Sequence, residues 1–251
     1  YTVAETKKKL SQMRIGAIGE AVTLVASRVN RQIMKNRIGC ELVDLEIAEL
    51  IREYEAGGYE ENEFVKAIKA RSSRPEETEK ALHVYGAVKR MTEKYRLDAV
   101  TVRCFDLLGT IQTTGCLALA ILNAEGIPAA CEGDTRSLLS MTILHALTGE
   151  PVFMANPSQL DAGKQEMIFA HCTIPANMPD DYTLTTHFES GIGVALAGHM
   201  NPGPVTVFKC DESMERYYVQ NAELKESLQR EDLCRTQLQL FLPEGTDYFL
   251  K

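Results

Sequence analysis

Two carboxylates, Glu132 and Asp134, follow a short apolar run and precede a segment of helical character. Residues 127–131 are expected to form a buried strand, and the carboxyl end of such a strand is where open α/β sheets bind ligands. A second apolar run, residues 151–154, is expected to close a β-α-β unit with Asn156 at its carboxyl end. Oxygen ligands from two strand ends would then converge at one edge of the sheet.

Asp134 also has a purely structural interpretation. Aspartate is a preferred N-cap residue, and the helix dipole favours acids in the first turn. Asp134 or Thr135 is therefore expected to cap the helix that follows, and Asp134 is kept as a second acid-base candidate. Glu132 has no comparable local explanation, so it is the stronger catalytic candidate.

Two of the five histidines, His171 and His187, stand at the ends of apolar, strand-like runs. A lone histidine there is more often a hydrogen-bonded structural residue, but strand-end histidines can also converge on one pocket. If Glu132, His171 and Asn156 meet, they form an incomplete octahedral shell suited to Mn²⁺ or Mg²⁺. Such an ion would acidify a sugar C–H and stabilise an ene-diolate while a carboxylate moves the proton. The expected reaction is aldose-ketose isomerisation, with His187 as a substrate contact.

Other polar residues are expected near the same edge. Arg103 and Gln112 follow a third predicted strand and are substrate candidates, although a local ion pair of Arg103 with Asp106 and a polar loop role for Gln112 explain them equally well. The loop from Gly16 to Glu20 raises the alternative of nucleotide binding. It lacks the full GxGxxG pattern and the lysine of a P-loop, so this is the weakest interpretation.

The elements that must position these groups alternate between strand and helix in the first half. The strands are predicted at residues 14–18, 40–45, 97–103 and 127–131, and the helices at 21–34, 47–55, 61–70, 75–95, 115–124 and 135–147. Repeated crossovers of this kind imply a parallel, doubly wound sheet.

The pattern changes after residue 150. Strand-length runs separated by turns rich in Pro, Gly, Asp and Asn are found at residues 166–173, 182–187, 193–197, 205–209 and 237–242. We predict an α/β (Rossmann-like) domain over residues 1–150 and a smaller, mainly antiparallel β domain over 151–251. The carboxylates would lie at the domain seam, where small-molecule pockets are common.

Composition excludes several classes of protein. The chain has 251 residues, is 45% hydrophobic and 25% charged, and carries a net charge of −8 with its Lys and Arg scattered, which argues against nucleic acid as a partner. No apolar run reaches the roughly 20 residues that span a bilayer, and no signal peptide is evident, so we expect neither membrane insertion nor secretion. Seven cysteines without CxxC spacing favour reduced, buried thiols and a cytoplasmic protein.

Several stretches resemble the L-fucose and L-arabinose isomerase group, and most closely the L-fucose isomerase-like proteins. They are ACEGDTRSLLSMTILHALTGEPVFMANP, EMIFAHCTIP, THFESGIGVALAG and PVTVFKC. The resemblance runs from about Arg14 to the end and implies an α/β domain leading into a β-rich domain. It also implies an Mn²⁺-dependent aldose-ketose isomerase that assembles as a homo-oligomer. Glu132 matches the family's metal-binding and proton-transferring glutamate, and His171 a metal histidine of the arabinose branch.

The sequence departs from this family pattern at Asn156, which stands where the fucose branch has a second metal-binding aspartate. An amide supplies neither charge nor a proton acceptor, so metal binding should weaken. Asp134 is the nearest substitute, and Asp161 a weaker one. The chain also starts without Met and is expected to lack a preceding α/β domain and a later metal histidine, so we expect this fragment to fold with little isomerase activity.

The alternative to an enzyme is a sugar-binding or regulatory module that keeps the fold without the chemistry, since fold alone does not define function. The sequence does not identify the sugar, and sulfonated and phosphorylated sugars are among the possible substrates.

Overall fold

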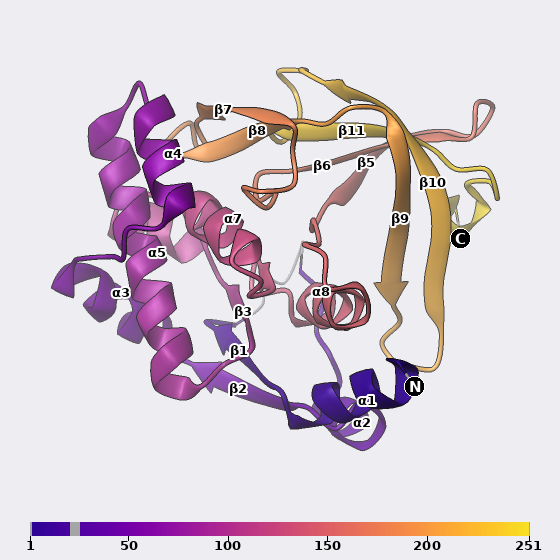
Figure 1. The fold of residues 1–251 in the computed structure, drawn as a ribbon, viewed down its shortest axis with the longest axis horizontal. Helices are drawn as coiled ribbons and strands as arrows, with labels where there is room; N and C mark the ends of the chain where they lie inside the picture. The colour runs from indigo at the N-terminus through magenta and orange to yellow at the C-terminus, as the bar shows by residue number, and fades with distance from the viewer. Residues whose placement is uncertain (1, 21–25, 251) are drawn as a thin grey trace.

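The computed structural model describes residues 2–20 and 26–250 of the chain (Figure 1). Among them, four parallel strands form the first sheet in the order β2-β1-β3-β4. Their bounds are β1 (Arg14–Ile18), β2 (Glu41–Leu45), β3 (Ala99–Val102) and β4 (Ala129–Ala130). Because β2 lies on one side of β1 and β3 on the other, the chain winds in both directions from β1. The predicted doubly wound α/β architecture is confirmed.

The helices of this half connect and cover the strands. They are α1 (Thr2–Gln12), α2 (Arg31–Arg37), α3 (Ile47–Ala56), α4 (Glu63–Arg71), α5 (Pro75–Tyr95), α6 (Phe105–Thr110), α7 (Cys116–Ala124) and α8 (Thr135–Thr148). Helix α5 has the predicted bounds, with Pro75 at its start, where a missing N–H does no harm. Helix α8 ends at Gly149, whose φ of 77° is the left-handed conformation that glycine adopts readily. No helix in the described ranges has both the length and the apolar character needed to cross a bilayer.

The helix predicted over residues 21–34 is shorter than expected. Residues 21–25 lie outside the described residues, and residues 26–30 are not helical. The helix begins at Arg31 because Asn30 caps it, with Oδ1 accepting a hydrogen bond from the Ile33 amide at 3.1 Å.

The second half is antiparallel, as predicted. Its described residues form a five-stranded sheet in the order β5-β6-β11-β10-β9 and a separate hairpin of β7 and β8. The bounds are β5 (Asn156–Asp161), β6 (Glu166–His171), β7 (Asp181–Thr185), β8 (Ala195–His199), β9 (Gly203–Cys210), β10 (Tyr217–Leu228) and β11 (Thr236–Phe241), with a short 3₁₀ helix, η1 (Asp247–Leu250), after them.

One predicted strand is wrong. Residues 151–154 do not join the parallel sheet, and the chain enters the antiparallel sheet at Asn156, which pairs with β6. The apolar side chains of this segment serve packing instead, because Met154 is buried and Val152 and Phe153 pack against the main core. A short apolar run has the same appearance in sequence whether it forms a buried strand or a buried connection.

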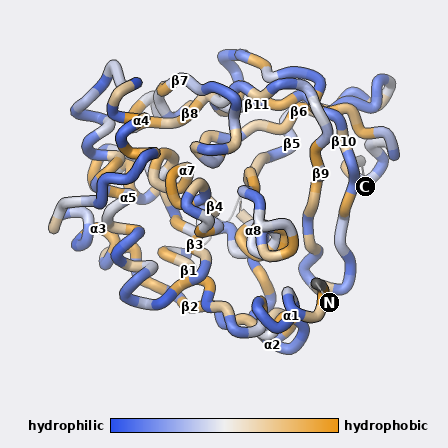
Figure 2. The backbone as a smooth tube through the Cα atoms, in the orientation of Figure 1, coloured by the Kyte–Doolittle hydropathy of each residue, from blue (hydrophilic) through white to orange (hydrophobic). Residues whose placement is uncertain are grey.

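The two halves share one apolar core. The largest cluster of buried side chains includes Ile15, Leu82 and Leu119 from the first half, and Ile174 and Leu196 from the second. Helix α8 lies between the parallel sheet and β9, near the centre of Figure 1. Many residues of α7 and α8 are apolar, as Figure 2 shows. The turn after β4, which opens α8, is therefore held between both halves.

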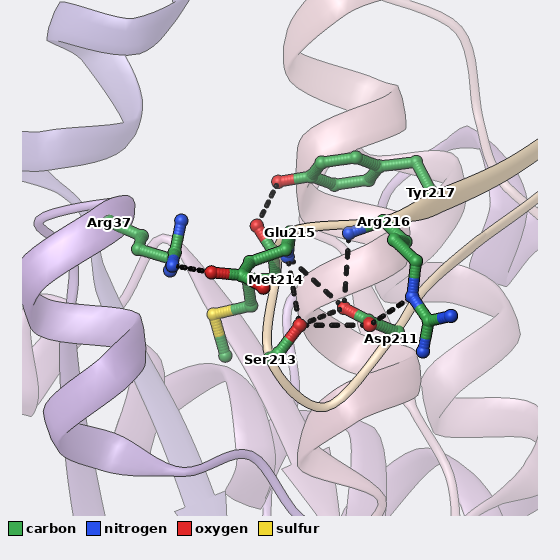
Figure 3. A network of polar contacts seen from close by, with 7 residues as sticks. All are labelled: Arg37, Asp211, Ser213, Met214, Glu215, Arg216 and Tyr217. Atoms are coloured by element: carbon green, nitrogen blue, oxygen red, sulfur yellow. Dashed lines mark hydrogen bonds and ion pairs between the residues drawn. The ribbon is translucent and has the colours of Figure 1, made fainter.

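The turn between β9 and β10 adds a polar link between the halves (Figure 3). The Asp211 carboxylate accepts hydrogen bonds from the Ser213 hydroxyl and from the amides of Glu215 and Arg216 at 2.9–3.3 Å. The Glu215 carboxylate pairs with Arg37 at the end of α2. The turn is held by its own hydrogen bonds, and the Glu215–Arg37 ion pair joins it to α2, the helix before β2.

Candidate functional site

Glu132 and His171 lie together at the seam of the two halves. Glu132 occupies the turn after β4, and His171 is the last residue of β6. His171 Nε2 is 3.7 Å from Glu132 Oε1, and the two residues are only 4% and 8% exposed. Sequence reasoning placed a carboxylate and an imidazole at strand ends, and the structure brings these two to one place.

The turn that presents Glu132 is strained. Glu132 has a φ of 66°, in the left-handed region that residues with a Cβ rarely adopt, and Gly133 follows with a φ of 68°. The Gly133 amide donates to the Val102 carbonyl at 3.1 Å, and the Asp134 amide to the Cys131 carbonyl at 3.1 Å, so the turn is bound to its own sheet. Strain of this kind concentrates at functional sites because surrounding contacts must maintain it.

The Glu132 carboxylate is incompletely satisfied. Its Oε2 atom is buried and has no hydrogen-bond partner within the described residues, and Oε1 faces His171 at a distance longer than a hydrogen bond. Leaving a buried charged group without partners is costly. A cation or a donor group of a ligand at this position would remove that cost.

His171 is held from its other side. Nδ1 lies 3.0 Å from the Thr173 hydroxyl oxygen, and Thr173 is 1% exposed. In the sheet, His171 is paired with Thr236 of β11, which fixes its backbone. These contacts leave Nε2 directed toward Glu132. Sequence reasoning missed Thr173, although its position two residues after a strand-end histidine is a usable signal.

Asp134 is the N-cap of α8, so the structural interpretation is confirmed. Its Oδ1 accepts from the Ser137 amide at 2.6 Å, and Oδ2 accepts from the Ser27 amide at 3.0 Å. The Ser27 hydroxyl donates to the same carboxylate at 2.9 Å. Both oxygens are engaged, and Asp134 ties residues preceding α2 to the first turn of α8.

Arg103 makes the local ion pair that was the alternative to a substrate role. Its Nε is 3.0 Å from Asp106 Oδ1. Gly19 packs against it: a Cβ on Gly19 would lie 2.9 Å from the Arg103 Cβ, and Gly19 has a φ of 79°. The glycine after the first strand is thus explained by close approach and a tight turn. Glu20, the residue after Gly19, is exposed, and its Oε2 atom lies 3.6 Å from an Arg28 guanidinium nitrogen.

Two further candidates, Gln112 and Asn156, are not brought to the pair, and no hydrogen bond or ion pair among the described residues joins them to Glu132. Gln112 is exposed in the loop between α6 and α7. Asn156 is exposed and is paired with Ala170 of β6. Paired residues project to the same face of a sheet and successive residues to opposite faces, so the Asn156 side chain lies on the face opposite that of His171. Its predicted convergence with Glu132 depended on the parallel strand that does not form.

His187 is buried and hydrogen-bonded. Nδ1 lies 2.9 Å from the Ser190 hydroxyl, and the ring meets Phe105 edge-on with 6.2 Å between centroids. Phe105 opens α6, directly after β3, so His187 covers the carboxyl edge of the parallel sheet. The structural role weighed for this histidine fits these contacts.

Cysteines surround the pair, a feature that spacing alone did not indicate. Cys131 precedes Glu132 and has its Sγ 2.7 Å from that of Cys104, while Cys172 follows His171 and packs with Cys116. All seven cysteines of the chain fall in the described part and are free, and six are buried. Contact with the Cys104 sulfur and burial raise the pKa of the Cys131 thiol well above its usual value. The expectation of buried thiols is confirmed for six of them, and Cys131 is a neutral packing group beside the carboxylate.

The pair fits part of a metal site. In the part of the chain that the structure describes, no group of three or more His, Cys, Asp or Glu side chains is arranged to hold an ion. In an octahedral shell with ligands about 2.1 Å from Mg²⁺, adjacent ligands lie about 3.0 Å apart and opposite ligands about 4.2 Å apart. The 3.7 Å separation of Nε2 and Oε1 lies between these two values, so the two atoms would have to move closer to act as adjacent ligands. The unpartnered Oε2 is a suitable oxygen ligand. Two protein ligands leave the other positions to water or substrate.

A separate cavity of about 550 Å³ lies between α8 and the inner face of the antiparallel sheet. Its walls are mainly apolar, and Lys209 on β9 donates from Nζ to the Ser137 hydroxyl at 2.6 Å on its wall. Burial lowers the pKa of the Lys209 ammonium. Neither Glu132 nor His171 lines this cavity.

No protein-family model matches the chain. It is similar to two sulfoquinovose isomerases. The protein from Clostridium sp. (strain MSTE9) is 26% identical over 216 residues, which cover 82% of this chain and 46% of that protein. The protein from Alkalicoccus urumqiensis is 25% identical over 142 residues, which cover 52% of this chain and 31% of that protein. The chain thus spans less than half the length of these relatives, and their names specify a sugar isomerase without specifying the L-fucose branch.

Proposed function

We propose that this chain forms part of an aldose-ketose isomerase whose reaction centre contains Glu132 and His171. The observation that carries the proposal is a buried carboxylate with an unpartnered oxygen, held in a strained turn 3.7 Å from a buried imidazole. The similarity to two sulfoquinovose isomerases supports the reaction class. Sulfoquinovose, a sulfonated sugar, is therefore the first substrate to test.

In the proposed chemistry Glu132 moves the proton between two carbons, and His171 is a ligand of the divalent ion. Glu132 takes the proton from C2 of the open-chain aldose and returns it to C1, because a carboxylate can act as base and then as acid on neighbouring carbons. The hydroxyl proton on O2 passes to O1 through a water molecule, so that the carbonyl and the hydroxyl exchange places, and His171 Nε2 lies beside the carboxylate.

Glu132 and His171 would also hold the divalent ion, Mn²⁺ or Mg²⁺. When bound, such an ion polarises the adjacent carbonyl and hydroxyl oxygens of the sugar and so acidifies the C–H between them. The Thr173 hydroxyl and the pairing of β6 with β11 keep the imidazole in place to bind the ion.

The test is proton exchange at C2, measured on the complete native polypeptide that contains this chain. Sulfoquinovose is incubated in D₂O with Mn²⁺, the metal is removed, and deuterium at C2 and formation of the ketose are followed by NMR. Glu132→Gln keeps the shape of the side chain but removes the base, and we expect the rate to fall about 10²- to 10⁴-fold. The matched control is Glu76→Gln, at an exposed position of α5, with an unchanged rate. Undiminished exchange in Glu132→Gln would contradict the proposal.

A non-catalytic sugar-binding module is the second candidate. The observation in its favour is that the described residues contain no group of three metal-ligating side chains. A module of this kind would bind sugar with equal affinity in the presence of Mn²⁺ and of a chelator, and would show no exchange at C2.

A further inference from the structure

Thr173 contacts the His171 ring at Nδ1, whereas the other ring nitrogen, Nε2, is the one near Glu132. Its hydroxyl oxygen is 3.0 Å from His171 Nδ1, and the two residues are 1% and 4% exposed. Strand β6 ends at His171 and the chain bends at Cys172, and the side chains of His171 and Thr173 meet across this bend. The segment is held at both ends, by the pairing of His171 with β11 and by the Ala176 amide, which donates to the Ala120 carbonyl of α7 at 3.0 Å.

A hydroxyl differs from a carbonyl oxygen as a partner for an imidazole nitrogen, because a hydroxyl can both donate and accept a hydrogen bond. A neutral imidazole carries one proton, on Nδ1 or on Nε2. When the Thr173 oxygen accepts from Nδ1–H, Nε2 presents a lone pair toward Glu132. When the Thr173 hydroxyl donates to Nδ1, Nε2 presents its N–H toward Glu132. A carbonyl oxygen at the same place could support only the first arrangement.

We propose that Thr173 is a positioning residue that fixes the plane of the His171 ring and supports both of its neutral tautomers. Nε2 then offers a lone pair to a divalent cation when one is present, and an N–H toward the Glu132 carboxylate when none is. The cation in this statement rests on the proposed function, whereas the hydroxyl-to-ring contact does not. The hydroxyl rotates while the ring stays in place, so the site changes its proton arrangement without changing its shape.

The test compares Thr173→Val, which keeps the branched shape but removes the hydroxyl, with Thr173→Ser, which keeps the hydroxyl. Histidine ring nitrogens are labelled with ¹⁵N in the complete native polypeptide, and NMR spectra are recorded without metal and with Mg²⁺, which is diamagnetic. In the unsubstituted protein we expect Mg²⁺ to shift His171 to the form protonated on Nδ1. In Thr173→Val we expect an altered Nδ1 signal without metal and an Mg²⁺ affinity about 10- to 100-fold weaker. Thr173→Ser should restore both.

The outcomes separate the two proposals. An Nδ1 signal and an Mg²⁺ affinity that are unchanged in Thr173→Val overturn the role of Thr173, even if the protein is a metal-dependent isomerase. An altered Nδ1 signal in a protein that binds no Mg²⁺ or Mn²⁺ upholds Thr173 as the residue that positions the ring and refutes the metal-dependent function. If Thr173→Val does not fold, Thr173→Ala gives the same readouts.

Discussion

The imidazole of His171 faces the carboxylate of Glu132 across the seam between the parallel sheet and the β-rich half, with Nε2 3.7 Å from Oε1. Glu132 comes from the turn after β4, and His171 from the end of β6. Neither half contains the pair alone. The shared core around α8 holds the two halves together and so sets the separation of the two groups.

Removal of the cap at Asp134 should destabilise the fold rather than the chemistry. Asp134→Ala deprives the Ser137 and Ser27 amides of their acceptor. We expect the free energy of unfolding, measured in urea, to fall by about 1–2 kcal/mol. Asp134→Asn is the comparison, because its one amide oxygen can still cap the Ser137 amide while its NH₂ cannot accept from the Ser27 amide. It should lose less stability than Asp134→Ala and retain the isomerase rate. A stable Asp134→Asn variant without activity would instead identify Asp134 as an acid-base residue.

Gly86 in α5 should not tolerate a methyl group. A Cβ there would lie 2.1 Å from the Gly58 carbonyl oxygen and 2.9 Å from the Tyr59 Cβ. Although alanine favours helices over glycine by about 1 kcal/mol, we expect Gly86→Ala to lose about 1–3 kcal/mol of stability through overpacking.

The matched control for that substitution is Gly109→Ala in α6, where a Cβ would meet nothing within 4 Å. Thermal unfolding should show Gly109→Ala at or above the melting temperature of the unsubstituted protein. Equal melting temperatures for Gly86→Ala and Gly109→Ala would show that α5 and the Gly58 turn pack less closely than described.

Lys209 should make stability depend on pH. Burial lowers the pKa of its ammonium in the folded state, so the unfolded chain binds more protons between that lowered pKa and the ordinary lysine value of about 10.4. In that window stability rises with pH. We therefore expect the unfolding free energy of the unsubstituted protein to rise relative to Lys209→Met as the pH increases from 7 to about 10.

Lys164→Met removes the same charge from a side chain that is 71% exposed and is the matched control for Lys209→Met. Unfolding free energies from urea titrations at several pH values provide the comparison. A constant difference between Lys209→Met and the unsubstituted protein over this range would contradict the burial of the ammonium.

The elements with strong local signals were predictable from the sequence. Pro75 and the long amphipathic pattern after it define α5, and Gly149 marks the end of α8. Strand β10 was missed because its hydropathy pattern does not follow its burial: the polar Gln220 is buried and the apolar Val219 beside it is exposed. Its place in the sheet is set by pairing with β9 and β11, which no local pattern reveals.

The site was predictable only in part, for the same reason. Glu132 and His171 follow apolar runs that are strands, so placing them at strand ends was correct. Asn156 was placed from a run that packs as a connection, and the antiparallel pairing of β5 leaves it exposed. The contact of Thr173 with Nδ1 depends on how the chain leaves β6, and the contact of Cys104 with Cys131 depends on neighbouring strand ends.

The most direct test of the account is calorimetric titration of Mn²⁺ into the complete native polypeptide. We predict micromolar binding that weakens at least about 10-fold in both Glu132→Gln and His171→Gln, because each variant removes one of the two facing ligands. His145→Gln, on α8 with its ring bonded to the Glu150 carbonyl, is the control and should bind as the unsubstituted protein does. Mn²⁺ binding of equal strength in Glu132→Gln and the unsubstituted protein would contradict the central claim that this pair forms the reaction centre.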